Sequence, residues 1–173
     1  LSYISNTSLI LTDGDGTRIK YLSSDGITYM PEQRFSEVST ITKNPDNTFS
    51  LRKKNGTVFT FSSDARLASI TDRNNNITTL TYTNVELTSI TDPYNRTAAL
   101  AYTSGKLTSI KDRNGNTTIL AYSGNNLTTI TDPSGRTIYI TYDSSNKITS
   151  ITDPSNNIYT FTYSNNNLIS VSF

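Results

Sequence analysis

Apolar residues recur along the second half of the chain at a fixed spacing of 20 residues. A leucine opens each unit, an isoleucine follows it, and a tyrosine closes the unit. The leucines are Leu67, Leu87, Leu107 and Leu127, and the isoleucines are Ile70, Ile90, Ile110 and Ile130. The tyrosines are Tyr82, Tyr102, Tyr122, Tyr142 and Tyr163. A fixed period of this size predicts a repeat architecture, in which each unit packs mainly on its neighbours.

Each unit divides into two short strands. The second strand alternates, so that Ile138, Ile140 and Tyr142 share one face of a pleated sheet. The first strand is less regular, because Leu107 and Ile110 would lie on opposite faces of an undistorted strand. Either a β-bulge lies between them, or the leucine caps the turn. We therefore expect an all-β fold of antiparallel hairpins that form a curved, spiralling sheet.

An aspartate follows the first strand of every unit. In a type I turn an aspartate at the first position accepts a hydrogen bond from the backbone, proline suits the second position and glycine the fourth. The segment 132–135, Asp-Pro-Ser-Gly, fits this description throughout. Asn114-Gly115 predicts a two-residue hairpin turn instead. The recurring aspartates are Asp72, Asp92, Asp112, Asp132 and Asp153.

The repeat phase divides the chain into two predicted parts. Residues 67–173 form the regular array, and residues 1–66 form irregular lead-in hairpins. The strands expected in the lead-in are 8–12, 17–21, 27–30, 38–42, 48–52 and 57–61, and residues 32–38 are weakly helical or a loop. The period lengthens once to 21, between Tyr142 and Ile148. Because turns absorb length changes and paired strands do not, this stretch is predicted to be a surface turn.

Composition excludes several functions. The chain has 173 residues, 34% of them hydrophobic, and a net charge of +1 without a Lys/Arg cluster, which argues against a nucleic-acid partner. It contains no Cys and no His, so we expect no zinc-type metal site, no thiol nucleophile, no cofactor and no enzymatic activity. No apolar stretch is long enough to span a membrane. The chain opens on Leu1 rather than Met, and we expect it to be a fragment.

Two recurring side chains invite a functional interpretation. Stacked tyrosines bind sugar rings in some proteins, but tyrosines at one repeat phase also pack on cross-strand neighbours. Carboxylates bind Ca²⁺, but one aspartate per unit is already explained by a turn. We therefore interpret the tyrosines and aspartates as structural repeat positions and predict no catalytic or metal-binding residue.

The units resemble RHS repeats, also called YD repeats. The best match is Leu127 to Tyr142-Asp143, and the segments TDGDGTRIKY (12–21) and KKNGTVFTF (53–61) resemble the lead-in to such repeats in bacterial wall-associated and RHS proteins. The resemblance implies a strip of β-hairpins that curls into a spiral and, in longer relatives, closes into a shell around a C-terminal toxin. The family's self-cleaving C-terminal segment has no counterpart in this chain, so no catalytic residue is carried over.

The resemblance implies a structural role. We expect a module of a secreted or cell-surface bacterial RHS/YD-repeat protein that builds β-sheet wall. The expected partners are further repeats of the parent chain, an enclosed toxin domain or a cell-surface glycan, and end-to-end self-association through unpaired strand edges. The alternative is an adhesion module that binds a glycan or a protein on a concave sheet. The two hypotheses differ in whether the tyrosine rings are packed or exposed.

Overall fold

A computed structural model describes residues 1–32 and 39–173. It contains eighteen strands and, in these ranges, no helix. The strands are β1 (Ser2–Ser5), β2 (Ser8–Thr12), β3 (Arg18–Leu22), β4 (Thr28–Pro31), β5 (Thr40–Lys43), β6 (Phe49–Arg52), β7 (Val58–Phe61), β8 (Leu67–Thr71), β9 (Ile77–Thr83), β10 (Glu86–Thr91), β11 (Thr97–Thr103), β12 (Lys106–Lys111), β13 (Thr117–Ser123), β14 (Asn126–Thr131), β15 (Thr137–Tyr142), β16 (Ile148–Thr152), β17 (Ile158–Ser164) and β18 (Asn167–Ser172). The expected all-β class is confirmed.

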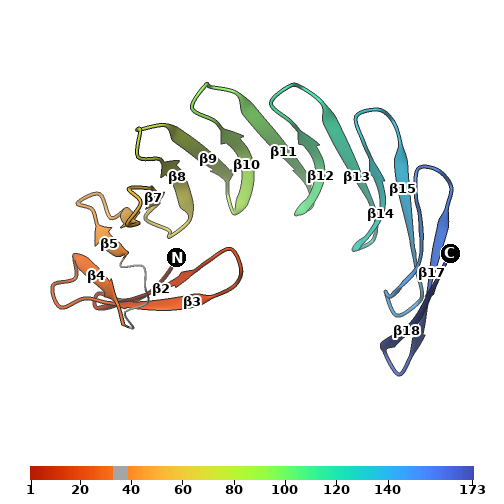
Figure 1. Cartoon of the computed structure of the whole chain (residues 1–173), viewed down its shortest axis with the longest axis horizontal. Coiled ribbons are helices and arrows are strands. Elements are labelled where there is room, and N and C mark those ends of the chain that lie inside the picture. Colours follow the sequence, from red (N-terminus) through yellow and green to blue (C-terminus); the bar gives the residue numbers. More distant parts are fainter. Residues whose placement is uncertain (33–38) are drawn as a thin grey trace. The chain divides into compact units, whose positions relative to one another are not determined.

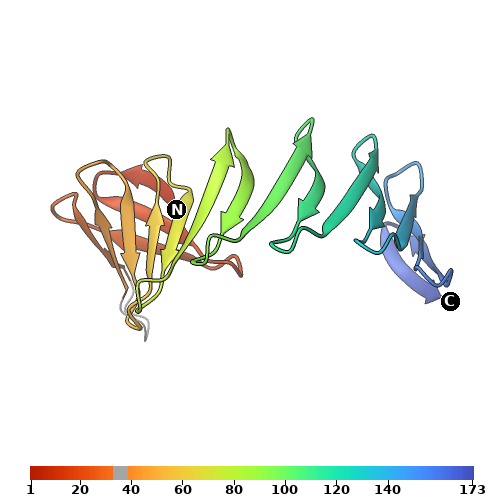
Figure 2. The same cartoon turned by 90° about the horizontal axis from the view of Figure 1, so that it is seen from above.

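The chain forms two compact units. Unit 1 comprises Leu1–Tyr82 and Ile90–Arg96, and unit 2 comprises Thr83–Ser89 and Thr97–Phe173. Within each unit, strands that follow one another in the sequence pair antiparallel, so the sheet grows by successive hairpins (Figures 1 and 2). The predicted division at residues 66 and 67 follows the repeat phase rather than compactness, and it stays a prediction.

Unit 1 has a closed hydrophobic core. Strands β2 to β7 each contribute at least one side chain to it, and the ring of Tyr29 meets the ring of Phe49 edge-on at 6.5 Å. The buried residues are Leu9, Leu11, Tyr21, Tyr29, Ile41, Phe49, Leu51 and Phe61. Fully burying a side chain of this kind contributes roughly 1.5–3 kcal/mol. The lead-in hairpins, although irregular in sequence, therefore form the packed part of the protein.

Unit 2 has no closed core. Its second strands alternate between partly buried and exposed residues, and Leu100 and Tyr102 share the partly buried face of β11. Ile138, Ile140 and Tyr142 share the corresponding face of β15, as the alternation predicted. No described residue after Phe61 is fully buried. Unit 2 is thus a single layer of hairpins with a half-covered apolar face.

A β-bulge resolves the irregular first strand. Leu107 is opposite Tyr102, but the next pair joins Ser109 to Ala101, which leaves Thr108 as an extra residue. Because the bulge restores the phase, Leu107 and Ile110 lie on the same face as Tyr102. The same shift occurs between β13 and β14, where Thr128 is the extra residue.

Two features differ from the predictions, and a third prediction falls mainly on residues that the structure does not describe. Strand β1 was not predicted, although it pairs with β2. Asn114-Gly115 is not a two-residue turn, because Asp112 N–H donates to the Asn116 carbonyl and Gly115 N–H to the Asp112 carbonyl, as in the other aspartate turns. Most of the predicted loop or helix at 32–38, and the first residue of the predicted strand 38–42, lie outside the described residues.

Candidate functional site

The recurring tyrosines hold the bulged strands together. The Tyr122 hydroxyl on β13 donates to the Leu107 carbonyl on β12 at 2.9 Å, and the Tyr142 hydroxyl donates to the Leu127 carbonyl at 2.8 Å. In unit 1 the Tyr82 hydroxyl reaches the Leu67 carbonyl at 3.1 Å. The acceptor is in each case the leucine that opens the same unit, directly before the bulge. The hydroxyl therefore satisfies a carbonyl at the point where the regular ladder is interrupted.

The tyrosine rings are not open to solvent. All five recurring tyrosines, Tyr82, Tyr102, Tyr122, Tyr142 and Tyr163, are partly buried. A cation lies over three of the rings: Arg66 over Tyr82 at 5.0 Å, Lys106 over Tyr122 at 5.9 Å and Lys147 over Tyr163 at 5.3 Å from the ring centroid. Each of these cations lies immediately before the apolar residue that opens a unit. The faces of these three rings are therefore in contact with side chains of the protein itself.

The recurring aspartates close the turns that join the two strands of each unit. In the turn at Asp132, one carboxylate oxygen accepts the N–H groups of Ser134 and Arg136, both at 2.9 Å. The other oxygen accepts the Arg136 Nε–H at 2.6 Å. The residue at the fourth position has positive φ, 81° at Gly135, which is the geometry of a type I turn followed by a G1 bulge.

The same pattern recurs at every unit with one substitution. An asparagine replaces the arginine at three of the five turns, and its side-chain amide donates to the carboxylate of Asp72, Asp112 or Asp153 at 2.8–2.9 Å. Arg96 pairs with Asp92 as Arg136 does with Asp132. These bonds favour the ionised form, so the side-chain donor, ahead of the backbone N–H groups, lowers the pKa of all five carboxyls.

The carboxylates are therefore used within their own turns. Both oxygens of each recurring aspartate accept hydrogen bonds, and the donors are the residues two and four positions later in the chain. In the described ranges no three Asp or Glu residues come close enough together to hold a metal ion. The recurring aspartates therefore serve to stabilise turns.

The one-residue slip of the period is a change of turn type. Elsewhere the strands that carry tyrosine are followed by two-residue loops, as at Ser104-Gly105, where both residues have positive φ. After Tyr142, Asp143 opens a loop of the longer type, with Asp143 N–H bonded to the Lys147 carbonyl at 2.9 Å. Residues 143–146 are exposed, as the insertion predicted.

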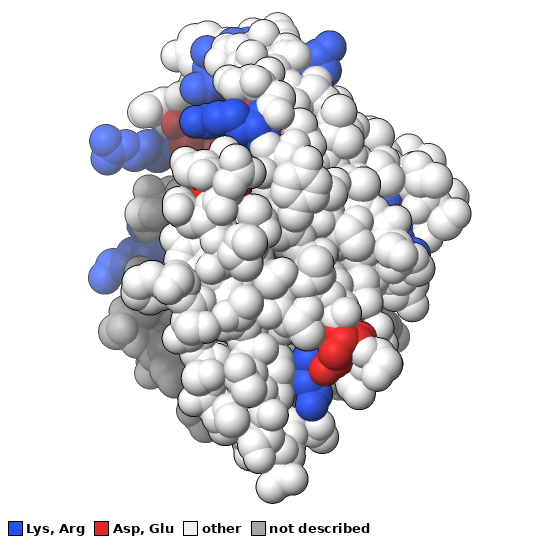
Figure 3. Space-filling model, turned by 90° about the vertical axis from the view of Figure 1, so that its right-hand side faces the viewer, with Lys and Arg blue, Asp and Glu red and all other residues white. Residues whose placement is uncertain are grey.

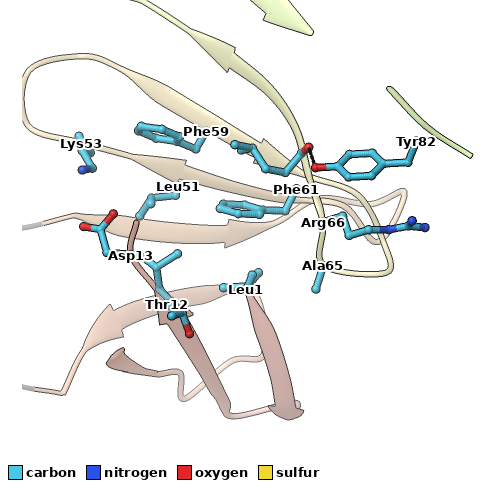
Figure 4. A pocket seen from close by; sticks show the side chains of 12 residues that line it. Leu1, Thr12, Asp13, Leu51, Lys53, Phe59, Phe61, Ala65, Arg66 and Tyr82 are labelled. Atoms are coloured by element: carbon cyan, nitrogen blue, oxygen red, sulfur yellow. Dashed lines mark hydrogen bonds between the residues drawn. The ribbon is translucent and has the colours of Figure 1, made fainter. Parts of the chain in front are cut away.

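Unit 1 contains a cavity of about 390 Å³. Its walls come from the ends of β2, β6, β7, β8 and β9, and the side chains of Leu11, Leu51, Phe59, Phe61 and Leu67 make them largely apolar (Figure 4). Lys53, Asp13 and Arg66 are the charged residues of the lining. Sequence reasoning missed this cavity, because the residues that form it lie far apart along the chain and the repeat pattern does not show that they meet.

Sequence reasoning also missed the partner of the tyrosine hydroxyl. A signal was present, since every donor follows its acceptor by 15 residues, as Tyr122 follows Leu107. The period alone does not show which backbone group the ring reaches, because that depends on the bulge. The cations over the rings likewise share one phase of the repeat, but their residue type varies.

Comparison with known proteins agrees with this geometry. The sequence model of the RHS Repeat family matches residues 102–137, which span β12, β13 and β14. No curated protein matches the chain. No described helix is long and apolar enough to cross a membrane. The matched segment contains the tyrosine, bulge and aspartate-turn arrangement that recurs on either side of it, so this part of the chain is similar to an RHS repeat.

Proposed function

We propose that the chain is a structural module of a secreted or cell-surface bacterial RHS/YD-repeat protein, and that it builds β-sheet wall. In a longer parent chain this wall would enclose a C-terminal toxin. The observation that carries the proposal is the use of the recurring side chains. The Tyr122 hydroxyl is bonded to a backbone carbonyl, its ring lies under Lys106, and the Asp112 carboxylate is bonded within its turn.

The half-covered apolar face of unit 2 supports this role. A hairpin of a repeat array buries its apolar residues mainly against neighbouring hairpins. The partly buried row of β11, β13, β15 and β17 continues from hairpin to hairpin without a second layer. Such a face suits the inside of a wall, where it contacts what the wall surrounds. No catalytic role is proposed, since the chain lacks the His and Cys that serve most often as base and nucleophile.

Further repeats are the proposed partners of strand β18. This strand is exposed throughout, and residues 154–173 contain no Asp, Glu, Lys or Arg. Figure 3 shows that uncharged residues dominate the surface turned towards the viewer. Natural edge strands are commonly protected by charge, especially lysine. An uncharged edge favours pairing, either with the next repeat of a parent chain or end to end with another copy.

The edge is tested by adding a charge to it. We expect the chain to associate as its concentration rises, and Ile169→Lys on β18 to shift the equilibrium towards the monomer. Val85→Lys adds the same charge at a turn residue that is 84% exposed and should leave association unchanged. Light scattering after size-exclusion chromatography measures both. A wild-type chain that stays monomeric at millimolar concentration contradicts the proposed edge pairing.

Substitution of the recurring tyrosines distinguishes a structural role in a β-sheet wall from a role in adhesion. Tyr102→Ala and Tyr122→Ala should each lower the free energy of unfolding by several kcal/mol, up to the roughly 3–5 kcal/mol lost when a large buried aromatic is truncated. Urea unfolding gives the change in stability, and a glycan array gives binding. Variants that keep their stability but lose a glycan bound by the wild type would favour the adhesion module and refute the wall.

A further inference from the structure

The cavity in unit 1 has the properties of a ligand site. We propose that it binds a small amphipathic carboxylate, with the apolar part of the ligand between β2 and β7 and the carboxylate on the ammonium group of Lys53. A volume of about 390 Å³ falls in the range of small-molecule sites.

The apolar walls are fixed by the hydrophobic core. Leu11, Leu51 and Phe61 are at most 8% exposed, so they belong to the core and also face the cavity. Phe59 and Leu67 are partly buried and pack against the same cluster. A ligand would therefore enter a preformed site, and it would displace water from apolar surface without reorganising the strands.

Lys53 supplies the polar anchor. Its ammonium lies 5.3 Å from the centre of the Phe59 ring, on the wall of the cavity (Figure 4). The residue is partly buried, whereas the adjacent Lys54 is exposed. Lys53 forms no salt bridge with any residue in the ranges 1–32 and 39–173. A partly buried cation without a salt-bridge partner favours an anionic group, and a hydrogen bond with an ionised partner is about twice as strong as one between neutral groups.

The other two charged side chains of the lining are already engaged. The guanidinium of Arg66 is paired with Asp64 and lies over the Tyr82 ring. The carboxylate of Asp13 is exposed and accepts the Gly14 N–H at 2.9 Å within its own turn. Neither charge competes with Lys53 for the ligand, and this is why the proposed ligand carries one negative charge beside its apolar part.

The experiment uses decanoate and the full chain. Isothermal titration calorimetry measures affinity, and chemical shifts of the leucine methyl groups locate the bound molecule. We expect decanoate to bind and to perturb the methyl groups of Leu51 and Leu67. Decyltrimethylammonium has the same tail and the opposite charge, and it should bind at least tenfold more weakly. This comparison needs no variant, so it does not depend on the folding of a mutant.

Lysine variants test the anchor. Lys53→Met should weaken decanoate binding at least tenfold, Lys53→Arg should retain most of it, and Lys54→Met is the matched control that should behave as wild type. Thermal unfolding verifies that each variant is folded. The proposal is overturned if decanoate does not bind at millimolar concentration, or if Lys53→Met and Lys54→Met bind equally. Equal affinity for the two probes, or shifts confined to unit 2, overturns it as well.

Discussion

The bond between Tyr122 and the Leu107 carbonyl can be removed almost without other change. Tyr122→Phe keeps the ring on β13 and deletes only the hydroxyl, which donates at 2.9 Å. A hydrogen bond of this kind contributes about 0.5–1.5 kcal/mol, and its loss leaves the carbonyl before the bulge without this donor. Because the site is only partly buried, water replaces part of what is lost. We therefore expect the free energy of unfolding to fall by about 1 kcal/mol.

A second site and a control sharpen this prediction. Tyr142→Phe removes the equivalent bond to Leu127 and should also cost about 1 kcal/mol. The double variant measures the coupling between the two sites, because Leu127 is directly opposite Tyr122 in the pairing of β13 with β14. Tyr139 is 51% exposed on the opposite face of β15, and its hydroxyl has no hydrogen-bond partner in the described part of the chain. Tyr139→Phe should change stability by no more than about 0.5 kcal/mol.

Urea unfolding followed by circular dichroism is the assay. The midpoint reports stability, and an unchanged slope shows that the same surface unfolds in wild type and variant. Equal midpoints for Tyr122→Phe and Tyr139→Phe would show that the hydroxyl bonds do not hold the bulged strands, and the structural interpretation of the tyrosines would fail. A lower slope in Tyr122→Phe alone would indicate that neighbouring hairpins unfold separately.

Three further predictions follow from the turns. Ala65 has φ of 66°, a conformation that costs an alanine roughly 1–2 kcal/mol. Ala65→Gly should therefore raise the free energy of unfolding by about 0.5–1 kcal/mol. An unchanged free energy of unfolding in urea would contradict this. Inserting one residue after Gly124 should be tolerated, because that loop would lengthen to the type of loop found at Asp143. An insertion after Ile119 reverses the faces of β13 and should unfold unit 2. Equal melting temperatures of the two insertion variants would refute the distinction. The pKa of Asp25 is lowered to about 2, chiefly by the Thr28 and Ile27 N–H groups, and that of Asp64 to about 2, chiefly by Arg66. Their contribution to stability is therefore complete above the unfolded value near 3.8 and is lost as pH falls towards 2, so thermal unfolding across this range should show a decline that Asp25→Asn reduces.

Much of unit 2 was predictable from local chemistry. The alternation in TIYITY places Ile138, Ile140 and Tyr142 on one face whatever the rest of the chain does, because a strand has a two-residue pleat. The turn at Asp132 was equally predictable, since the carboxylate bonds to N–H groups within four residues of it. Asn114-Gly115 misled because a two-residue turn and a G1 bulge both place glycine where φ is positive, and the longer loop was selected by Asp112.

The sequence by itself determined the period, the faces of the second strands and the position of the aspartate turns, because these depend on residues close together in the chain. Tertiary structure decided the remainder. The bulge at Thr108 exists because two strands must keep their apolar faces in phase, and only then does the Tyr122 hydroxyl meet the Leu107 carbonyl. The core of unit 1 and its cavity bring Leu11 on β2 to Phe61 on β7. Contacts of that kind depend on how a sheet closes, and a pattern of single residues does not encode them locally.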